Sequence, residues 1–362
     1  MKLNTIKKYI WVLAISSFFI VGCNQHQTQF ISPNNEKIEY MGRIGKTDSL
    51  AVIYWSGSSM TVSFEGTSVS AVLQDEKGAN YFNVIIDNDS LRILKLDALK
   101  KTYSLADSLH DGKHTVQLFK RTEWTSGKTN FYGFQVNGEV LNIPPKEKCI
   151  EFYGNSITSG YAVEDYSGND SPDSTFTNNY NSYAAMTVRH FYANYTCISR
   201  SGIGITVSWF PQIMPDLYNR LDPENQQSKW DFNRQTPDIV VVNLFQNDSW
   251  LINRPENEEF KNRFGEKPPD KEIIINAYKG FVKNIRNKYI DAQIICMLGN
   301  MDITKEGSPW PGYVQTAVDS LKDKNIHTLF VPYKNTPGHP RIEEQRVLAD
   351  SLIKFIEKKT DW

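Results

Sequence analysis

The hydrophobic and polar positions follow two different patterns along the chain, and the pattern changes near residue 145. Before that point, short runs rich in β-branched and aromatic residues alternate with glycine-containing turns such as Ser56-Gly57, Glu65-Gly66 and Asn137-Gly138. Many short strands punctuated in this way predict an all-β sandwich or jelly-roll domain over residues 37–145. The predicted strands span residues 50–54, 61–64, 69–73, 81–86, 114–120 and 131–136.

After the stiff segment Ile143-Pro144-Pro145, the pattern predicts alternating strands and helices. Apolar runs at 149–153, 195–199, 239–244, 294–298 and 328–331 indicate strands, and amphipathic segments at 180–192, 271–289, 311–323 and 342–358 indicate helices. This alternation is typical of a parallel sheet with helices on both faces, so we expect a three-layer α/β/α domain over residues 146–362. Ligands bind beyond the carboxyl ends of such strands, which directs attention to the residues that follow each one.

The N-terminal 23 residues have the pattern of an export signal. Lysines at positions 2, 7 and 8 precede an apolar stretch over 10–21 that is too short to span a membrane. It ends in Gly22-Cys23, which resembles a bacterial lipobox, although a plain signal peptide is the alternative. We therefore expect a secreted lipoprotein of the bacterial cell envelope, anchored through acylated Cys23, with residues 24–36 as a tether.

Charge and cysteine content narrow the remaining function classes. A formal net charge of -1 gives no basic excess for binding nucleic acid. Cys149, Cys197 and Cys296 lie in predicted strands without a Cys-x-x-Cys spacing, so we expect small buried side chains and no metal site. Three cysteines allow at most one disulfide, whose presence stays open.

Polar residues and glycines follow four of the predicted strands. They are Gly154-Asn155-Ser156, Ser201-Gly202-Ile203-Gly204, Asn247-Asp248 and, near the C-terminus, His339-Pro340. A serine at the start of a helix exposes its oxygen beside backbone N–H groups that can hold a developing oxyanion. Taken singly, each segment has an ordinary alternative as a helix cap, a turn or a surface side chain.

The order of these residues resembles that of the SGNH (GDSL-type) hydrolases. In that resemblance Ser156 is the nucleophile, Asn247 the amide and His339 the base, and the glycine is Gly204, with Gly202 as the alternative. The upstream half carries His114-Thr115-Val116, Lys120-Arg121-Thr122-Glu123, Pro144-Pro145 and Ile150-Glu151-Phe152. With them, nearly the whole mature chain resembles carbohydrate esterase family 2, which joins a jelly-roll domain to an SGNH domain.

The resemblance implies a serine esterase that removes acetyl groups from plant polysaccharides such as xylan and mannan, without a metal or organic cofactor. The N–H groups of Ser156 and Gly204, with the Asn247 amide, would form the oxyanion hole. The sequence departs from the family pattern in two respects. Asn155 replaces an aspartate, and Thr336 and Pro337 stand where the acid before the histidine is usual. We therefore expect a backbone carbonyl, Thr336 or Asn335 to orient His339.

Several alternatives stay open from the sequence. Trp250 is a candidate sugar-stacking platform, and Trp209 and Trp310 are weaker ones. The same chemistry could act on lipid esters, thioesters or sugar acid esters. The chain could also be an inactive surface glycan-binding lipoprotein, because the usual acid is missing. The oligomeric state is unknown.

Overall fold

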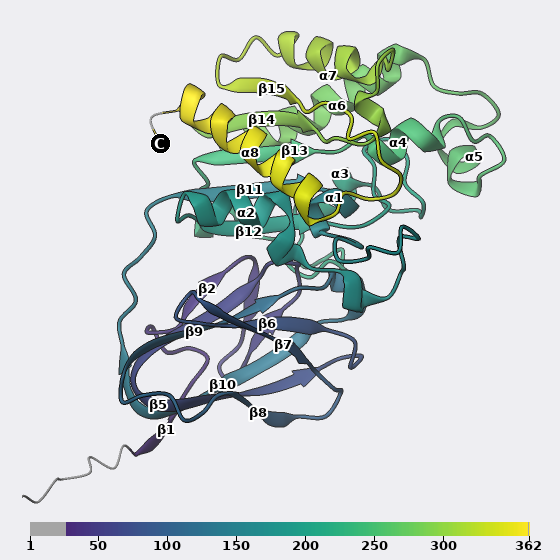
Figure 1. The fold of residues 1–362 in the computed structure, drawn as a ribbon. Helices are drawn as coiled ribbons and strands as arrows, with labels where there is room; N and C mark the ends of the chain where they lie inside the picture. Colours follow the sequence, from purple (N-terminus) through teal and green to yellow (C-terminus); the bar gives the residue numbers. More distant parts are fainter. Residues whose placement is uncertain (1–26, 361) are drawn as a thin grey trace, which may run out of the picture.

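The computed structural model describes residues 27–360 and Trp362, which form two domains stacked on one another (Figure 1). The predicted signal peptide and Cys23 lie outside the described residues. Antiparallel strands build the first domain, and a parallel sheet with helices builds the second. The predicted fold class is confirmed in both halves.

The first domain is built from ten antiparallel strands in one hydrogen-bonded sheet. The main strand order is β3-β4-β10-β5-β9-β6-β7, while β1 pairs with β10 and both β2 and β8 pair with β5. The sheet encloses an apolar core of its own. The strands are β1 (Thr28–Ile31), β2 (Glu39–Met41), β3 (Ile44–Lys46), β4 (Ala51–Ile53), β5 (Ser59–Asp75), β6 (Tyr81–Ile86), β7 (Ser90–Lys95), β8 (Lys101–Ala106), β9 (Gly112–Lys120) and β10 (Thr129–Leu141).

The predicted tether over residues 24–36 is wrong from Thr28 onward, where the chain already belongs to the β domain. Strand β1 pairs antiparallel with β10, with Thr28 opposite Asn137 and Ile31 opposite Phe134. Only Ile31 of this strand is buried, so the segment lacks the alternating apolar pattern that identifies a strand. The domain therefore begins before residue 37.

Two predicted turns lie instead inside long strands. Gly66 of β5 pairs with Gly138 of β10, where the register between the two strands shifts. A Cβ atom on Gly66 would lie 2.0 Å from the carbonyl oxygen of Asn137, so only glycine allows the two backbones to approach this closely. Glycines inside a strand thus mark an irregularity in pairing, and the strands on either side continue through it.

The second domain has a five-stranded parallel sheet in the order β12-β11-β13-β14-β15. Successive residues of its central strand face opposite layers. Val240 and Val242 pack with helices α6 (Lys271–Arg286) and α7 (Trp310–Asp319), and Val241 packs with α2 (Tyr183–His190) and α8 (Ile342–Lys359). Helices therefore cover both faces (Figure 1). The strands are β11 (Cys149–Gly154), β12 (Asn194–Ser199), β13 (Ile239–Asn243), β14 (Gln293–Leu298) and β15 (Ile326–Phe330).

Eight helices are described in this domain; those over residues 183–190, 271–286, 310–319 and 342–359 lie close to the predicted segments, and the four shorter ones were not predicted. The eight are α1 (Ser156–Ser159), α2 (Tyr183–His190), α3 (Met214–Leu217), α4 (Gln246–Leu251), α5 (Glu258–Phe264), α6 (Lys271–Arg286), α7 (Trp310–Asp319) and α8 (Ile342–Lys359). Short 3₁₀ turns occur at η1 (Trp124–Ser126), η2 (Ser174–Phe176), η3 (Asn179–Asn181), η4 (Phe232–Arg234) and η5 (Asp302–Thr304).

The two domains share buried contacts. Trp55 and Trp124 of the first domain pack into the apolar layer under α6 and α7 of the second. Arg43 of the first domain is fully buried, pairs with Glu151 of β11 at 3.3 Å and donates to the Tyr153 hydroxyl at 3.0 Å. Buried charges persist where they are paired and hydrogen-bonded, so this ion pair fixes the first domain against the start of the parallel sheet.

The three cysteines in the described part of the chain are buried and free. This confirms the prediction that they are small interior side chains. Burial raises the pKa of the Cys149 and Cys296 thiols to about 12, which keeps both protonated and unreactive at neutral pH. Among residues 27–360, no helix has the length and apolarity needed to cross a membrane.

Candidate active site

Ser156 stands at the first position of helix α1, directly after the carboxyl end of β11. The Asn155 side chain caps this helix by accepting from the N–H of Ile157 at 3.0 Å. The turn is tight, since a Cβ atom on Gly154 would lie 2.0 Å from the Thr158 hydroxyl. Asn155 therefore performs a capping role that an aspartate could also perform, and the short turn fixes the Ser156 hydroxyl at the edge of the sheet.

His339 lies 183 residues further along the chain, yet its Nε2 atom is 2.8 Å from the Ser156 Oγ. It precedes α8 and follows the last strand of the sheet. Its ring packs edge-on against Tyr161, with ring centroids 5.0 Å apart. The structure therefore brings together the two residues that the sequence analysis singled out first, within hydrogen-bonding reach.

Asp170 holds the other side of the His339 ring. Its Oδ2 atom is 2.7 Å from Nδ1 of His339 and 2.9 Å from the backbone nitrogen of the same residue. The other carboxylate oxygen accepts from Arg341 at 2.7 Å. A carboxylate at Nδ1 assigns the proton to that nitrogen and leaves Nε2 free to accept from Ser156.

The surroundings of Asp170 stabilise its ionised form. Partial burial alone would raise the pKa of this carboxyl, but the hydrogen bonds and charge of His339, together with Arg341, hold the pKa well below its usual range. Gly338 has a positive φ of 71°, and a Cβ atom there would lie 2.8 Å from a carboxylate oxygen of Asp170. Glycine at this position allows the carboxylate to reach the histidine backbone.

The expectation that Thr336, Asn335 or a carbonyl orients the ring is wrong. The Thr336 hydroxyl accepts from Lys334 at 2.6 Å and donates to Glu344. The acid comes from the loop after α1, far from the histidine in sequence and among other acidic residues that cap turns. One of these, Asp165, shapes the loop by accepting from the backbone N–H of Ser171 at 2.7 Å. No local spacing could have distinguished Asp170 from these neighbours.

The turn after β12 offers two glycines, and their backbone N–H groups differ. The N–H of Gly204 donates to the Ser208 hydroxyl at 2.9 Å. No described residue accepts from the N–H of Gly202, which has a left-handed φ of 83°. An oxyanion donor must be unoccupied before substrate binds, so this geometry favours Gly202 over Gly204, against the order of preference drawn from the sequence.

Asn247, in α4 after β13, has a fixed amide orientation. Its Oδ1 accepts from the indole N–H of Trp209 at 3.1 Å, and its Nδ2 donates to the carbonyl of Ile203 at 2.8 Å. Both bonds require the same placement of oxygen and nitrogen. The second N–H of the Asn247 amide makes no hydrogen bond to a described residue.

Asp248, the neighbour of Asn247, holds the turn after β12 in place. Its buried carboxylate accepts from the backbone N–H of Thr206 at 2.6 Å and from that of Ile205 at 3.1 Å. Burial raises the pKa of Asp248, partly opposed by the hydrogen bonds from this turn. Asn247 and Asp248 therefore fix the turn from one side.

A residue of the first domain reaches this same turn. The Glu123 carboxylate accepts from the backbone N–H of Ser201 at 2.9 Å and from its hydroxyl. Nearby, Lys120 is fully buried and donates to the carbonyls of Tyr54 at 2.6 Å and Gly127 at 2.8 Å, and burial lowers its pKa to about 7. The Lys120-Arg121-Thr122-Glu123 segment thus connects the β domain to the turn beside Gly202.

The three candidate tryptophans lie in different environments. Trp310 is buried and packs against Phe245 with ring centroids 4.9 Å apart, so it belongs to the core and is not a platform. Trp250 is half-buried and donates to Asp302 at 2.8 Å. Trp209 is 41% exposed and contacts Asn247, which makes it the exposed tryptophan beside the candidate oxyanion residues.

No group of three or more His, Cys, Asp or Glu side chains that could hold a metal ion occurs within the described part of the chain. The site therefore consists of a hydroxyl, an imidazole and a carboxylate in one hydrogen-bonded series, at the carboxyl edge of a parallel sheet. This arrangement defines the class of serine-dependent hydrolases with a three-layer α/β/α domain.

Comparisons with known proteins agree with that class. The sequence profile described as "Carbohydrate esterase 2 N-terminal" matches residues 40–145. A solved family two carbohydrate esterase from Clostridium thermocellum, in complex with cellohexaose, is 31% identical with a TM-score of 0.79, covering 89% of this chain and 98% of that one. A family two carbohydrate esterase from Cellvibrio japonicus is 23% identical with a TM-score of 0.82, covering 93% and 99%.

Two curated relatives have informative names. The cellulase/esterase CelE of Acetivibrio thermocellus is 32% identical over 91% of this chain, which spans 40% of the length of CelE. An acetylxylan esterase / glucomannan deacetylase of Cellvibrio japonicus is 24% identical, covering 97% of this chain and 98% of the relative. The chain belongs to carbohydrate esterase family 2. This confirms the predicted family, whose named members are carboxylic ester hydrolases.

Proposed function

We propose that this protein is a serine esterase that removes acetyl groups from plant cell-wall polysaccharides of the xylan or mannan type, through an acyl-enzyme. The observation that carries the proposal is the continuous series Ser156 Oγ, His339 ring, Asp170 carboxylate, with 2.8 Å and 2.7 Å between successive partners. The names of the relatives support the class of substrate.

In the proposed reaction, His339 Nε2 takes the proton from the Ser156 hydroxyl as the oxygen attacks the acetyl carbonyl. The resulting oxyanion accepts from the N–H of Ser156, the N–H of Gly202 and the unoccupied N–H of Asn247. Protonated His339 then gives its proton to the sugar oxygen, which leaves as a hydroxyl. Asp170 stabilises the imidazolium during both proton transfers.

The second half of the cycle reverses these roles. A water molecule gives a proton to His339 while its oxygen attacks the acetyl-serine carbonyl. Collapse of this second oxyanion breaks the bond to Ser156, which recovers its proton, and acetate leaves. No metal ion or organic cofactor takes part in any of these steps.

Two other functions were left open by the sequence. An inactive glycan-binding lipoprotein was plausible because the acid before the histidine is missing. Asp170 fills that role from another loop, which argues against a decayed site. Esterase activity on other acyl groups uses the same residues, so rates on acetyl, butyryl and longer 4-nitrophenyl esters should fall with acyl length if acetyl esters are the substrate.

The direct test is release of acetate from acetylated xylan and acetylated glucomannan by the purified protein and by its Ser156→Ala variant. We expect release from at least one polysaccharide by the parent protein and almost none by the variant. Equal rates for the two proteins would exclude Ser156 as the nucleophile.

We further propose that Cys23 carries the lipid that holds the protein to the bacterial envelope, based on the signal-like pattern of residues 1–23. Metabolic labelling with a radioactive fatty acid should label the full-length protein. The Cys23→Ser variant should carry no label and should leave the membrane fraction, whereas retained label would contradict the proposal.

A further inference from the structure

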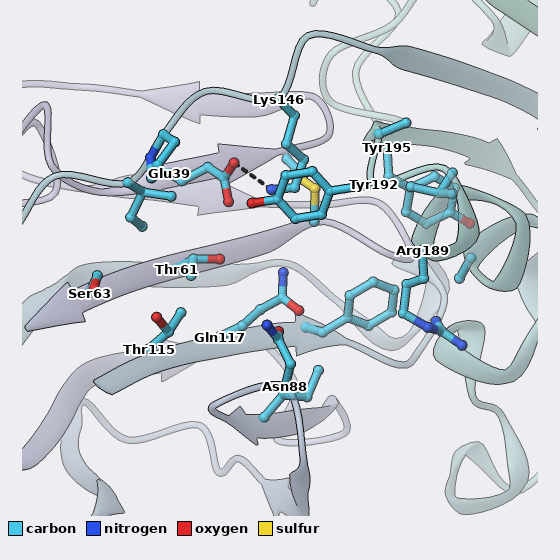
Figure 2. Close-up of a pocket in the computed structure, with 18 of the residues that line it drawn as sticks. Glu39, Thr61, Ser63, Asn88, Thr115, Gln117, Lys146, Arg189, Tyr192 and Tyr195 are labelled. Carbon is cyan, nitrogen blue, oxygen red and sulfur yellow. Dashed lines mark hydrogen bonds and ion pairs between the residues drawn. The ribbon is translucent and has the colours of Figure 1, made fainter. Parts of the chain in front are cut away.

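A groove of about 530 Å³ lies between the two domains, at the opposite end of the parallel strands from the catalytic residues. One wall is formed by strands β2, β5, β9 and β6 of the β domain, and the other by the linker and the end of α2 (Figure 2). The groove contacts Ala193 and Tyr195 at the start of β12, whereas Ser156 follows the carboxyl end of β11. A six-residue strand separates those ends by about 17 Å.

The β wall of the groove is a regular row of neutral polar side chains. Thr61 pairs with Gln117 across β5 and β9, and Ser63 pairs with Thr115. Residues two apart on a strand point to the same face, so all four side chains face the groove (Figure 2). The alternate residues Val62, Val116 and Leu118 face the core. Hydroxyl and amide groups in this row can donate to and accept from hydroxyl groups of a ligand.

Thr61 presents an unpaired hydroxyl in the wall of the groove. It is 5% exposed, and its hydroxyl is the one buried side-chain polar atom of the described groove lining that has no hydrogen-bond partner. Buried hydroxyls in folded proteins are nearly always paired. The neighbouring Gln117 uses its Nε2 to donate to Ser59 at 3.2 Å, which leaves its Oε1 to accept from a ligand.

The charged groups of the groove are already engaged with one another or with aromatic rings. Lys146 pairs with Glu39, as Figure 2 shows. Arg189 donates to the Tyr180 carbonyl at 2.7 Å and stacks over the Tyr180 ring at 3.6 Å. A site with paired charges and unoccupied hydroxyl and amide groups selects a neutral, hydroxyl-rich ligand.

Tyr192 is an exposed aromatic ring at the mouth of the groove, and its backbone conformation is unusual. It is 61% exposed with a left-handed φ of 49°. The N–H of Tyr192 donates to the carbonyl of Arg189, and the N–H of Ala193 donates to the carbonyl of Val188. These two bonds form a Schellman motif at the end of α2, in which Tyr192 occupies the position that glycine usually fills. Non-glycine residues held in this conformation cluster at binding sites, and an exposed aromatic face can pack against the apolar face of a sugar.

We propose that this groove is a second, non-catalytic site for a neutral oligosaccharide chain of the polysaccharide on which the enzyme acts. Tyr192 supplies the stacking surface, and the Thr61–Gln117 row supplies hydrogen bonds. The groove keeps the polysaccharide on the protein while the catalytic edge, at the other end of the strands, deacetylates it. The identity of the sugar rests on the proposed function, but the binding itself does not.

The test uses the Ser156→Ala protein, so that no substrate is turned over. Calorimetric titration with cellohexaose, xylohexaose and mannohexaose should reveal binding to at least one of them. When Tyr192→Gly is combined with Ser156→Ala, the affinity of that site should fall roughly tenfold or more. Glycine is the residue preferred at this backbone position, so the variant should fold with an unchanged or higher melting temperature. A second variant, Gln117→Ala, should weaken the same site. Phe30→Ala removes an equally exposed ring outside the groove and is the matched control.

In the active protein, Tyr192→Gly should leave hydrolysis of 4-nitrophenyl acetate unchanged and slow acetate release from insoluble acetylated polysaccharide several-fold. Unchanged affinity for all three hexaoses in Tyr192→Gly and Gln117→Ala would overturn the proposal. Loss of hexaose binding in a protein that releases no acetate would support the groove and refute the esterase. The two proposals therefore fail separately.

Discussion

Replacement of Asp170 by asparagine tests the part of the site that the sequence did not reveal. Each oxygen of this carboxylate accepts hydrogen bonds: Oδ2 from Nδ1 and the backbone N–H of His339, and Oδ1 from Arg341 and the same N–H. An amide has only one acceptor end. Whichever way the introduced amide is placed, its NH₂ group faces a donor.

The size of the effect follows from these contacts. If the NH₂ group faces Nδ1, the imidazole must carry its proton on Nε2 and cannot accept the proton of Ser156. In serine proteases with a Ser-His-Asp triad, the equivalent substitution lowers kcat about 10⁴-fold. The Asp170 side chain is 22% exposed, so water can partly compensate here. We expect kcat/KM to fall between about 10²-fold and 10⁴-fold, or roughly 3–5 kcal/mol.

The assay is hydrolysis of 4-nitrophenyl acetate at neutral pH, with circular dichroism to confirm folding. Asp173→Asn is the matched control, because Asp173 lies in the same loop and caps Thr175 without contacting His339. It should retain the parent activity within about twofold, since asparagine also caps helices well. An Asp170→Asn enzyme with a third or more of the parent kcat/KM would refute the proposed role of Asp170.

Four further outcomes are expected. Asn247→Ala should lower kcat roughly 10²–10³-fold in steady-state assays, and Trp209→Phe, which keeps an aromatic ring but removes the bond to Asn247, should lower it less; an equal or larger loss in Trp209→Phe would contradict the orienting role. Gly338→Ala should reduce activity and melting temperature together, because φ is positive and the added Cβ meets Asp170; unchanged values would show that the loop adapts freely. Because the folded pKa of Asp170 is depressed, its charge stabilises the fold fully above about pH 4, and this contribution shrinks gradually as pH falls toward the folded pKa; the stability difference between the parent and Asp170→Asn should therefore be constant above about pH 4 and decrease steadily below it in acid unfolding curves. Incubation with EDTA should leave esterase activity intact, and restoration of a lost activity by a divalent cation would contradict the metal-free mechanism.

The sequence predicted the elements whose pattern is repeated and local. The five strands and the four longest helices of the second domain lie within a few residues of the predicted segments. A strand buried on two faces leaves a continuous apolar run, and a helix buried on one face leaves an amphipathic period. The short helices α1, α3, α4 and α5 have neither pattern and were not predicted. The turn residues Ser156 and His339 could be found because they follow strands of one parallel sheet, whose carboxyl ends meet at a common edge.

The features that the sequence did not predict depend on contacts between distant segments. Asp170 reaches His339 through a loop whose shape is set by Asp165 and by the glycine before the histidine. The choice between Gly202 and Gly204 depends on which N–H group is already used by a neighbouring hydroxyl. In the β domain, the segments around Gly66 of β5 and Gly138 of β10 resemble turns in composition. Only the pairing of the two long strands shows that they are not turns.

If the Ser156 hydroxyl is activated by His339 as we propose, it becomes acetylated during turnover. Rapid acid quenching of the enzyme with excess 4-nitrophenyl acetate, followed by peptide mass spectrometry, measures this directly. We expect one acetyl group on the peptide that contains Ser156, and none on that peptide in Ser156→Ala. An enzyme that turns over at full rate while its acetyl group is found on another residue would contradict the proposal.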